Sequence, residues 1–202
     1  MSVSKHIRLF DRIARPYGWF YQVQTRGYLR LVQQYLPDIG LPAGSSVLDV
    51  GCGPGPFGAA FKHFGFSVTG VDGSPKMASI ALSNGLECRV ADATEKVPFP
   101  DRSFDMATAA YLAHGFPREH RVKLFHEMNR VADRLVILHD FSPAAGGFRL
   151  GSVTGFLEKL ERSDYVEFRK HGLEELRQIF PRVDLIQVDK QLSWYVCRRE
   201  AA

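Results

Sequence analysis

A glycine-rich turn and two acidic residues stand where predicted strands end. The apolar stretch 47–50 carries Asp49 and runs directly into the turn 51–55, whereas Asp72 and Asp92 each close a later apolar stretch. Glycines let backbone groups touch a ligand, because no Cβ atom stands in the way. Carboxylates at neighbouring strand ends accept hydrogen bonds from hydroxyl and amino groups. The pattern therefore predicts a site for a nucleoside-containing ligand.

Three polar residues near later strand ends are candidates for proton transfer. His114 follows the predicted fourth strand, and His139 and Asp140 end the fifth. Histidine titrates near neutral pH, which suits a general base. Because side chains alternate along a strand, His139 and Asp140 face opposite ways, and at most one of them faces a site. Each of the three also fits a structural role.

The spacing indicates neither a metal centre nor a serine hydrolase. His114, His120 and His126 recur every six residues, which scatters them around a helix. The chain has no HExxH motif and no GxSxG elbow. We therefore expect no bound metal and no nucleophilic serine.

A parallel sheet is needed to bring these residues together. Short apolar stretches alternate with stretches of helical spacing, which is typical of α/β folds. We expect a doubly wound, mostly parallel sheet that binds ligands at the carboxyl ends of its strands. The predicted strands cover residues 47–50, 67–72, 88–92, 104–109 and 135–140, followed by a helix at 173–180 and a hairpin of 183–188 and 192–197.

Length and composition fit one compact domain. The 202 residues are 45% hydrophobic and 24% charged, which is ordinary for a globular protein. No apolar run approaches the ~18 residues of a membrane span, and the start lacks an apolar signal core. The three cysteines are widely spaced without a CxxC pair. This predicts no disulfide framework and a reducing, cytoplasmic location.

The positive charge is concentrated in the N-terminal arm, residues 1–36. The arm holds six basic residues and one acidic residue, whereas the remainder holds 20 basic and 21 acidic residues. Amphipathic spacing predicts two helices in the arm, broken near Pro16 and Gly18, with aromatic residues clustered at 17–21. Such an arm suits an anionic substrate, a membrane surface or RNA, and equally a solvated helix face.

Two ligand classes fit the glycine turn. Gly53-x-Gly55-x-x-Gly58 matches the dinucleotide pattern GxGxxG, with Asp72 about 20 residues on at the ribose-binding position. That match favours an NAD(P)-binding oxidoreductase. Dinucleotide-binding enzymes explain the glycine turn and Asp72 well, but they account less well for Asp92 at the next strand end.

Four segments together resemble the class I S-adenosylmethionine-dependent methyltransferases. The resemblance covers residues 45–140 well, the N-terminal arm loosely, and residues 141–202 only in layout. Ala110-Tyr111-Leu112 stands where the branch that methylates amino groups of DNA or glutamine carries an Asn-Pro-Pro-Tyr signature, which argues against a nucleic-acid acceptor. The segments are Asp-Val-Gly-Cys-Gly-Pro-Gly at 49–55, Val-Asp-Gly-Ser-Pro at 71–75, Ala-Asp-Ala at 91–93, and the run at 97–105.

The resemblance implies a Rossmann-like sheet of seven strands with the last one antiparallel, in a single domain of residues 1–202. We expect an N-terminal helical cap at 1–40, a cofactor-binding core at 45–140, a substrate-cap insertion at 141–172, and the last helix and terminal hairpin at 173–202. The implied activity is methyl transfer from S-adenosylmethionine to a small or lipophilic molecule, as in the quinone branch of the family, with S-adenosylhomocysteine as product.

The resemblance also implies the residues of the cofactor site. Asp72 would accept the ribose hydroxyls and Asp92 the adenine amino group. Asp49 would brace the glycine turn or meet the methionine amino group. A non-catalytic adenosyl-binding module would share these features. The implied cofactor-binding residues are Asp49, Gly51, Cys52, Gly53, Asp72, Gly73, Met77, Asp92, Ala93, Ala110, Tyr111, Tyr17 and Tyr21.

Overall fold

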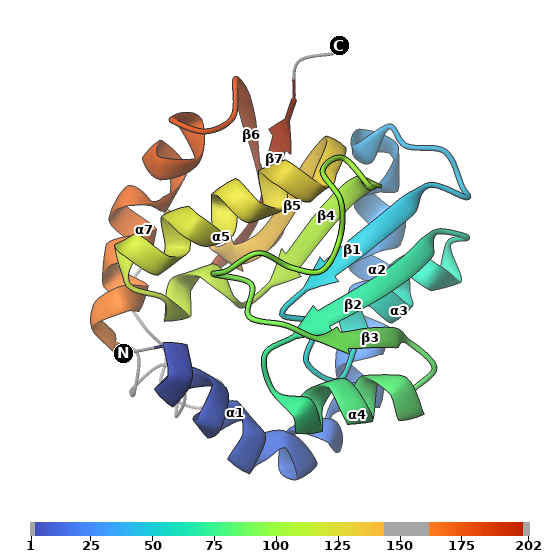
Figure 1. The fold of residues 1–202 in the computed structure, drawn as a ribbon. Coiled ribbons are helices and arrows are strands. Elements are labelled where there is room, and N and C mark those ends of the chain that lie inside the picture. Colours follow the sequence, from blue (N-terminus) through green and yellow to red (C-terminus); the bar gives the residue numbers. More distant parts are fainter. Residues whose placement is uncertain (1–2, 144–161, 200–202) are drawn as a thin grey trace.

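The protein is built on one mixed sheet with the strand order β3-β2-β1-β4-β5-β7-β6 (Figure 1). The computed structural model describes residues 3–143 and 162–199, with backbone alone for 3–6, 15–17 and 162–163. Strands β1 to β5 pair in parallel, and β7 runs antiparallel to both β5 and β6. This confirms the predicted fold class. The strands are β1 (Ser46–Val50), β2 (Ser67–Asp72), β3 (Glu87–Val90), β4 (Phe104–Ala110), β5 (Ala132–Phe141), β6 (Arg182–Gln187) and β7 (Leu192–Arg198).

Helices cover both faces of the sheet, so its central strands are buried on each side. In Figure 1 α5 and α7 lie in front of the sheet, with α2 and α3 behind it. Along β1, Val47 joins the core under α2 and α3, and Leu48 joins the core under α5 and α7. Such two-sided burial is typical of parallel sheets. The helical elements are α1 (Val3–Gly18), α2 (Tyr21–Ile39), α3 (Pro56–His63), α4 (Pro75–Ser83), η1 (Ala113–Gly115), α5 (Arg118–Val131) and α7 (Arg162–Arg177).

Several element boundaries differ from those predicted. Helix α1 continues past Pro16 to Gly18, and α2 continues past Pro37 to Ile39. Gly40 then ends α2 with a left-handed φ of 69°, the usual role of glycine after a helix. Helix α7 begins at Arg162 instead of 173, so part of the predicted cap insertion belongs to that helix. Residues 144–161, the rest of that insertion, lie outside the described residues.

A buried ion pair joins α5 to α7. The Arg121 guanidinium donates to both carboxylate oxygens of Glu175, at 2.7 and 2.8 Å. Its Nη1 also donates to the Phe116 carbonyl at 2.8 Å. The two side chains are only 1% and 3% exposed. The pair therefore fixes the two helices against each other and holds the segment that precedes α5.

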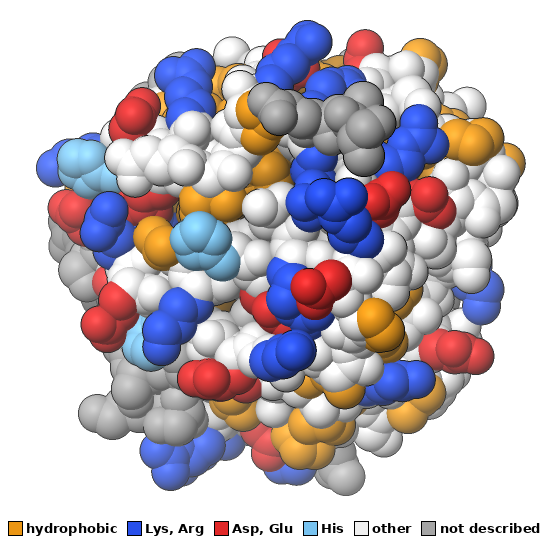
Figure 2. All heavy atoms as spheres, turned by 45° about the horizontal axis from the view of Figure 1, so that its top comes forward, with side chains coloured by type: hydrophobic (Ala, Val, Ile, Leu, Met, Phe, Trp, Pro, Cys, Tyr) orange, Lys and Arg blue, Asp and Glu red, His pale blue; other side chains and the backbone are white. Residues whose placement is uncertain are grey.

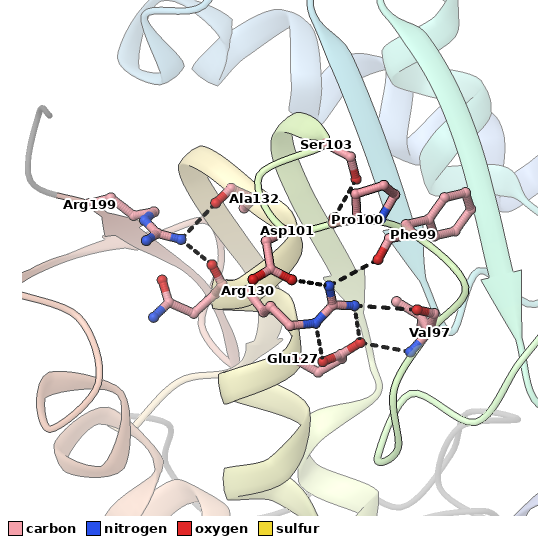
Figure 3. Close-up of polar contacts among 10 residues, drawn as sticks. Val97, Phe99, Pro100, Asp101, Ser103, Glu127, Arg130, Ala132 and Arg199 are labelled. Carbon is pink, nitrogen blue, oxygen red and sulfur yellow. Dashed lines mark hydrogen bonds and ion pairs between the residues drawn. The ribbon is translucent and has the colours of Figure 1, made fainter.

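A second arginine anchors the loop between β3 and β4 to α5 (Figure 3). Arg130 donates to the carbonyls of Val97 and Phe99 and pairs with Asp101 and Glu127. Glu127 in turn accepts the Val97 N–H at 2.7 Å. The loop that begins just after Asp92 is thus held at its far end by charged hydrogen bonds.

Candidate functional site

A cleft opens at the carboxyl ends of the parallel strands, as the sequence predicts. Its volume is about 890 Å³ with its open mouth included, within the range of small-molecule sites. Eleven of the thirteen predicted cofactor residues line it. They are Asp49, Gly51, Cys52, Gly53, Asp72, Gly73, Met77, Asp92, Ala93, Ala110 and Tyr111.

The glycine turn forms the floor of the cleft. Gly51 has a φ of 64°, and a Cβ atom there would lie 2.7 Å from Leu112 Cδ2. A Cβ atom on Gly53, by contrast, would have no heavy atom within 4 Å, since this residue faces open space. The turn thus offers bare backbone to a ligand.

Asp72 holds the turn with both of its carboxylate oxygens. Oδ2 accepts the Gly53 N–H at 2.8 Å, and Oδ1 accepts the Ser74 N–H at 2.8 Å. Asp72 also lines the cleft, and a carboxylate has about four lone-pair sites at which it can accept hydrogen bonds. The Ser74 hydroxyl accepts the Met77 N–H at 3.2 Å and caps α4.

Asp92 also lines the cleft, two residues beyond the end of β3. Its Oδ1 accepts both the N–H and the hydroxyl of Thr94, at 2.9 and 2.8 Å. These two bonds orient the carboxylate and leave its second oxygen for a ligand donor. Asp92 and Asp72 therefore stand at two neighbouring strand ends, as the sequence indicates.

Asp49 braces the turn from below. Its Oδ2 accepts the Gly58 N–H at 2.9 Å, and its Oδ1 accepts the Thr108 hydroxyl at 3.1 Å. Burial raises the pKa of Asp49 to about 7, although both hydrogen bonds oppose that shift. Of the two predicted roles for Asp49, the contacts support bracing, and the side chain also reaches the cleft wall.

The N-terminal helices, predicted as a cap, line the cleft, but the described residues that line it there are not Tyr17 and Tyr21, the two singled out for contact with the cofactor. Ile7 and Phe10 of α1 line the cleft together with Gln24 and Tyr28 of α2. The only sequence signal was the amphipathic spacing, which cannot tell a cleft-facing side from a core-facing one. Tyr21, the first residue of α2, is not among the described lining residues.

Helix α1 is held beside the cleft by contacts with α4 (Figure 1). Asp11 accepts the Ser74 hydroxyl at 2.9 Å and pairs with Lys76 at 3.1 Å. The bond from Ser74 is the main reason why the pKa of Asp11 is lowered. Tyr17 also lies in α1, but its side chain is outside the described part of the chain.

Comparison with known proteins agrees with this geometry. A family model described as a methyltransferase domain matches residues 47–134. The chain is 34% identical over 168 residues to demethylmenaquinone methyltransferase of Thermotoga maritima, covering 78% of this chain and 71% of that relative. The chain belongs to the S-adenosylmethionine-dependent methyltransferases.

Solved structures agree with this family at the level of the fold. A Methanococcus maripaludis structure described as an S-adenosylmethionine-dependent methyltransferase matches with a TM-score of 0.70 at 16% identity, covering 95% of this chain and 94% of that one. Magnesium protoporphyrin IX methyltransferase of Synechocystis PCC 6803, crystallised with S-adenosylmethionine, matches with a TM-score of 0.59 at 18% identity, covering 87% and 79%.

The cleft of this methyltransferase has features that fit the donor. Two strand-end carboxylates, a turn of exposed backbone and the buried wall residue Met77 lie around one space. In addition, the buried Gln24 Oε1 has no hydrogen-bond partner among the described residues. An unpaired buried oxygen costs about 1–3 kcal/mol, so this atom suits a ligand that donates a hydrogen bond.

The predicted base candidate His139 is buried behind the cleft of the methyltransferase. The Trp194 indole donates to its Nδ1 at 3.1 Å, and its ring packs against Tyr28, Phe57 and Tyr111. Burial lowers the pKa of His139 to about 4, so the ring is neutral at physiological pH. Its contacts are those of a residue that backs the aromatic wall, and it does not line the cleft as described.

His114 and Asp140 form a buried pair on the other side of β5. His114 Nδ1 lies 2.8 Å from Asp140 Oδ1, and Asp140 Oδ2 accepts the backbone N–H groups of Ala113 and His114. Asp140 therefore holds η1 against the strand. Neither residue is among the cleft-lining residues described here. His139 and Asp140 do face opposite ways, as the alternation predicts.

Proposed function

We propose that this methyltransferase transfers the methyl group of S-adenosylmethionine to a small, lipophilic acceptor that carries a hydrogen-bond donor. The observation that carries the proposal is the division of one cleft into two walls. Carboxylates and bare backbone supply one part of the lining, here called the polar wall; aromatic side chains, with one buried amide oxygen that has no partner among the described residues, supply another part, the aromatic wall.

The polar wall is the proposed donor site. Asp72 accepts the ribose hydroxyls while it continues to hold Gly53 and Ser74, and Asp92 accepts the adenine amino group with its second oxygen. Hydrogen bonds to charged groups contribute about 1.5–3 kcal/mol each. Met77 is 1% exposed and gives the adenine an apolar surface. Together with the backbone of the glycine turn at 51–55, these side chains form the proposed cofactor site.

The aromatic wall is the proposed acceptor site. Tyr28, Phe57 and Tyr111 line it, and their rings contact one another or the shared partner His139. Gln24 Oε1 supplies one acceptor among these apolar surfaces. Such a wall suits an aromatic molecule with a hydroxyl or amino group, because burial of the ring and pairing of Gln24 are then both favourable. The quinone in the name of the Thermotoga relative belongs to this chemical class once it is reduced.

The residues of the chain supply alignment and exclusion of water. When bound, S-adenosylmethionine supplies a methyl group on a positively charged sulfur, which is already an excellent leaving group. Positioning of two reactants can contribute about 7–11 kcal/mol of rate acceleration. Ile7 and Phe10 cover the cleft, and the floor turn fixes the donor from below. The proposed mechanism therefore assigns no proton transfer to His114, His139 or Asp140.

We further infer that a lipophilic acceptor reaches the cleft from an anionic membrane surface. At the junction of α1 and α2, Trp19 is 84% and Val23 69% exposed, and Phe20 is also exposed. Exposed Arg12 and Arg26 flank this corner, within the arm of net charge +5. Aromatic residues with adjacent cations suit the headgroup region of a bilayer. The same two helices line the cleft, so docking would bring its mouth to the lipid.

The face drawn in Figure 2 does not favour RNA as a partner. On the face drawn in Figure 2, acidic and basic side chains are interspersed, whereas an RNA-binding surface presents a field of positive charge.

Within the described ranges, no helix has the length and apolarity needed to cross a bilayer. We propose a reducing, cytoplasmic location on the basis of the sequence, in which the three cysteines are widely spaced without a CxxC pair.

Calorimetry with S-adenosylhomocysteine tests the donor site. Asp72→Ala is expected to weaken binding at least tenfold. Glu87→Ala is the matched control. It removes an exposed acid at the first position of β3, and this variant should bind S-adenosylhomocysteine normally. Unchanged affinity in Asp72→Ala would refute the donor site, and stabilisation by NADH instead would support the oxidoreductase.

Two further measurements test the acceptor site and the membrane surface. Gln24→Leu should raise KM for reduced demethylmenaquinone and leave the affinity for S-adenosylhomocysteine unchanged; an unchanged KM argues against the acceptor wall.

The fluorescence of Trp19 should shift to the blue when the protein binds vesicles that contain anionic phosphatidylglycerol, whereas the fluorescence of the buried Trp194 should not change. Trp19→Ala should abolish the shift, and equal binding to neutral vesicles would argue against an anionic surface.

A further inference from the structure

Two thiols meet beside the floor of the cleft. Cys52 lies in the glycine turn and lines the cleft, and Cys88 is the second residue of β3. Their Sγ atoms are 3.4 Å apart, although 36 positions separate the residues in the sequence. Both cysteines are free. The contact joins the donor-binding turn to the edge strand of the sheet.

A glycine in the intervening strand makes this contact possible. Cys88 pairs in register with Gly70 of β2, so the two sulfurs meet across β2. A Cβ atom on Gly70 would lie 2.7 Å from Cys52 Sγ, closer than real atoms approach. Gly70 does not have a positive φ, so it is the available space and not the backbone conformation that needs glycine here.

We propose that Cys52 and Cys88 form a reversible disulfide on exposure to hydrogen peroxide, and that this disulfide lowers the affinity of the site for the methyl donor. The effect on donor binding rests on the proposed function, whereas formation of the disulfide does not. A disulfide requires an S–S bond of about 2.05 Å, so closing the 3.4 Å gap between the two sulfurs across β2 draws the glycine turn toward β3.

The chemistry assigns different roles to the two thiols. Cys88 is half-buried and meets the oxidant, whereas Cys52 is 6% exposed. The Cys88 thiolate attacks one peroxide oxygen, the O–O bond breaks, and Cys88 becomes a sulfenic acid as hydroxide leaves. Cys52 sulfur then attacks Cys88 sulfur, and the sulfenic oxygen leaves as water. In total two thiols lose two electrons and two protons to one peroxide, which yields two waters.

Cys52 is not the thiol that first reacts with hydrogen peroxide. The hydrogen bond with Cys88 and burial raise its pKa, so it is protonated at neutral pH and a poor nucleophile toward peroxide. Its proton can leave with the sulfenic oxygen in the second step.

Cross-linking would alter the donor site through Gly53. Cys52 is flanked by Gly51 and Gly53, and the Gly53 N–H is held 2.8 Å from Asp72 Oδ2. Drawing Cys52 toward β3 displaces this backbone and the carboxylate that contacts it. Because linkage is reciprocal, a donor that binds the reduced form more tightly shifts the equilibrium between thiols and disulfide toward the thiols by the same factor.

The experiment uses the full chain, reduced, freed of reductant and treated with hydrogen peroxide. Peptide mapping without reductant should find a Cys52–Cys88 cross-link that dithiothreitol reverses. Cys197→Ser, which removes a buried cysteine in β7, should retain the cross-link, and Cys88→Ser should lose it. Gly70→Ala should slow its formation, because the added methyl group displaces Cys52.

Calorimetry with S-adenosylhomocysteine then measures the consequence. Oxidised protein should bind at least fivefold more weakly than reduced protein, and peroxide should leave the affinity of Cys88→Ser unchanged. Absence of the intramolecular cross-link, or equal affinity of both forms, overturns the inference. If reduced protein fails to bind at all, the proposed function is overturned, and the cross-link by itself still decides whether the thiols pair.

Discussion

Glu175→Ala removes one partner of the buried ion pair between α5 and α7. The substitution breaks two short bonds to Arg121 and leaves a guanidinium that is 1% exposed without its counter-charge. Loss of one partner from a buried pair costs about 3–5 kcal/mol. For a domain of this size, 1 kcal/mol lowers the Tm by about 2–4 °C, so the Tm should fall by roughly 6–20 °C.

Urea unfolding of matched variants measures this cost. The double variant Arg121→Met with Glu175→Leu removes both charges and should lose much less stability than Glu175→Ala, since apolar replacement of a buried pair is often neutral. Asp184→Ala, which breaks surface pairs with Arg182 and Arg198, should cost about 0–1 kcal/mol per pair. A loss below about 1 kcal/mol in Glu175→Ala would refute the reasoning. A double variant as unstable as Glu175→Ala would show that packing, not the unpaired charge, causes the loss.

Two further predictions concern the floor of the cleft. The pKa of Asp49 is raised from 3.8 to about 7, so the folded protein holds a proton that the unfolded chain releases, and wild-type stability should fall as pH rises from about 4 to 7. Asp49→Asn has no such proton and should gain stability over wild type above pH 7 but not near pH 4; a gain independent of pH in urea unfolding would contradict this. Gly51→Ala places a methyl group against Leu112 and should weaken S-adenosylhomocysteine binding at least tenfold by calorimetry, whereas Gly85→Ala, also at positive φ but with open space around it, should bind normally. Equal binding by both variants would show that the turn tolerates the methyl group.

The sequence alone determined the sheet and the polar wall of the cleft. Alternating apolar stretches fixed where the strands lie, and parallel pairing then brings their ends to one edge. The positions of Asp72 and Asp92 could be predicted because each follows an apolar stretch that forms a strand. The turn at 51–55 could be predicted because its glycines by themselves indicate a tight turn. Local patterns sufficed here, since each feature depends on a few consecutive residues and on strand direction.

Only the tertiary structure decided which side chains from distant segments meet. The spacing in α2 did not reveal that Gln24 and Tyr28, not Tyr21, face the cleft, because helix rotation is set by packing. The sequence predicted His139 as a candidate general base at a strand end. In the structure the Trp194 indole and aromatic rings from other elements bury it. Cys52 meets Cys88 because Gly70, in the strand between them, has no side chain. Such contacts are products of packing between segments far apart in the chain, and no local periodicity encodes them.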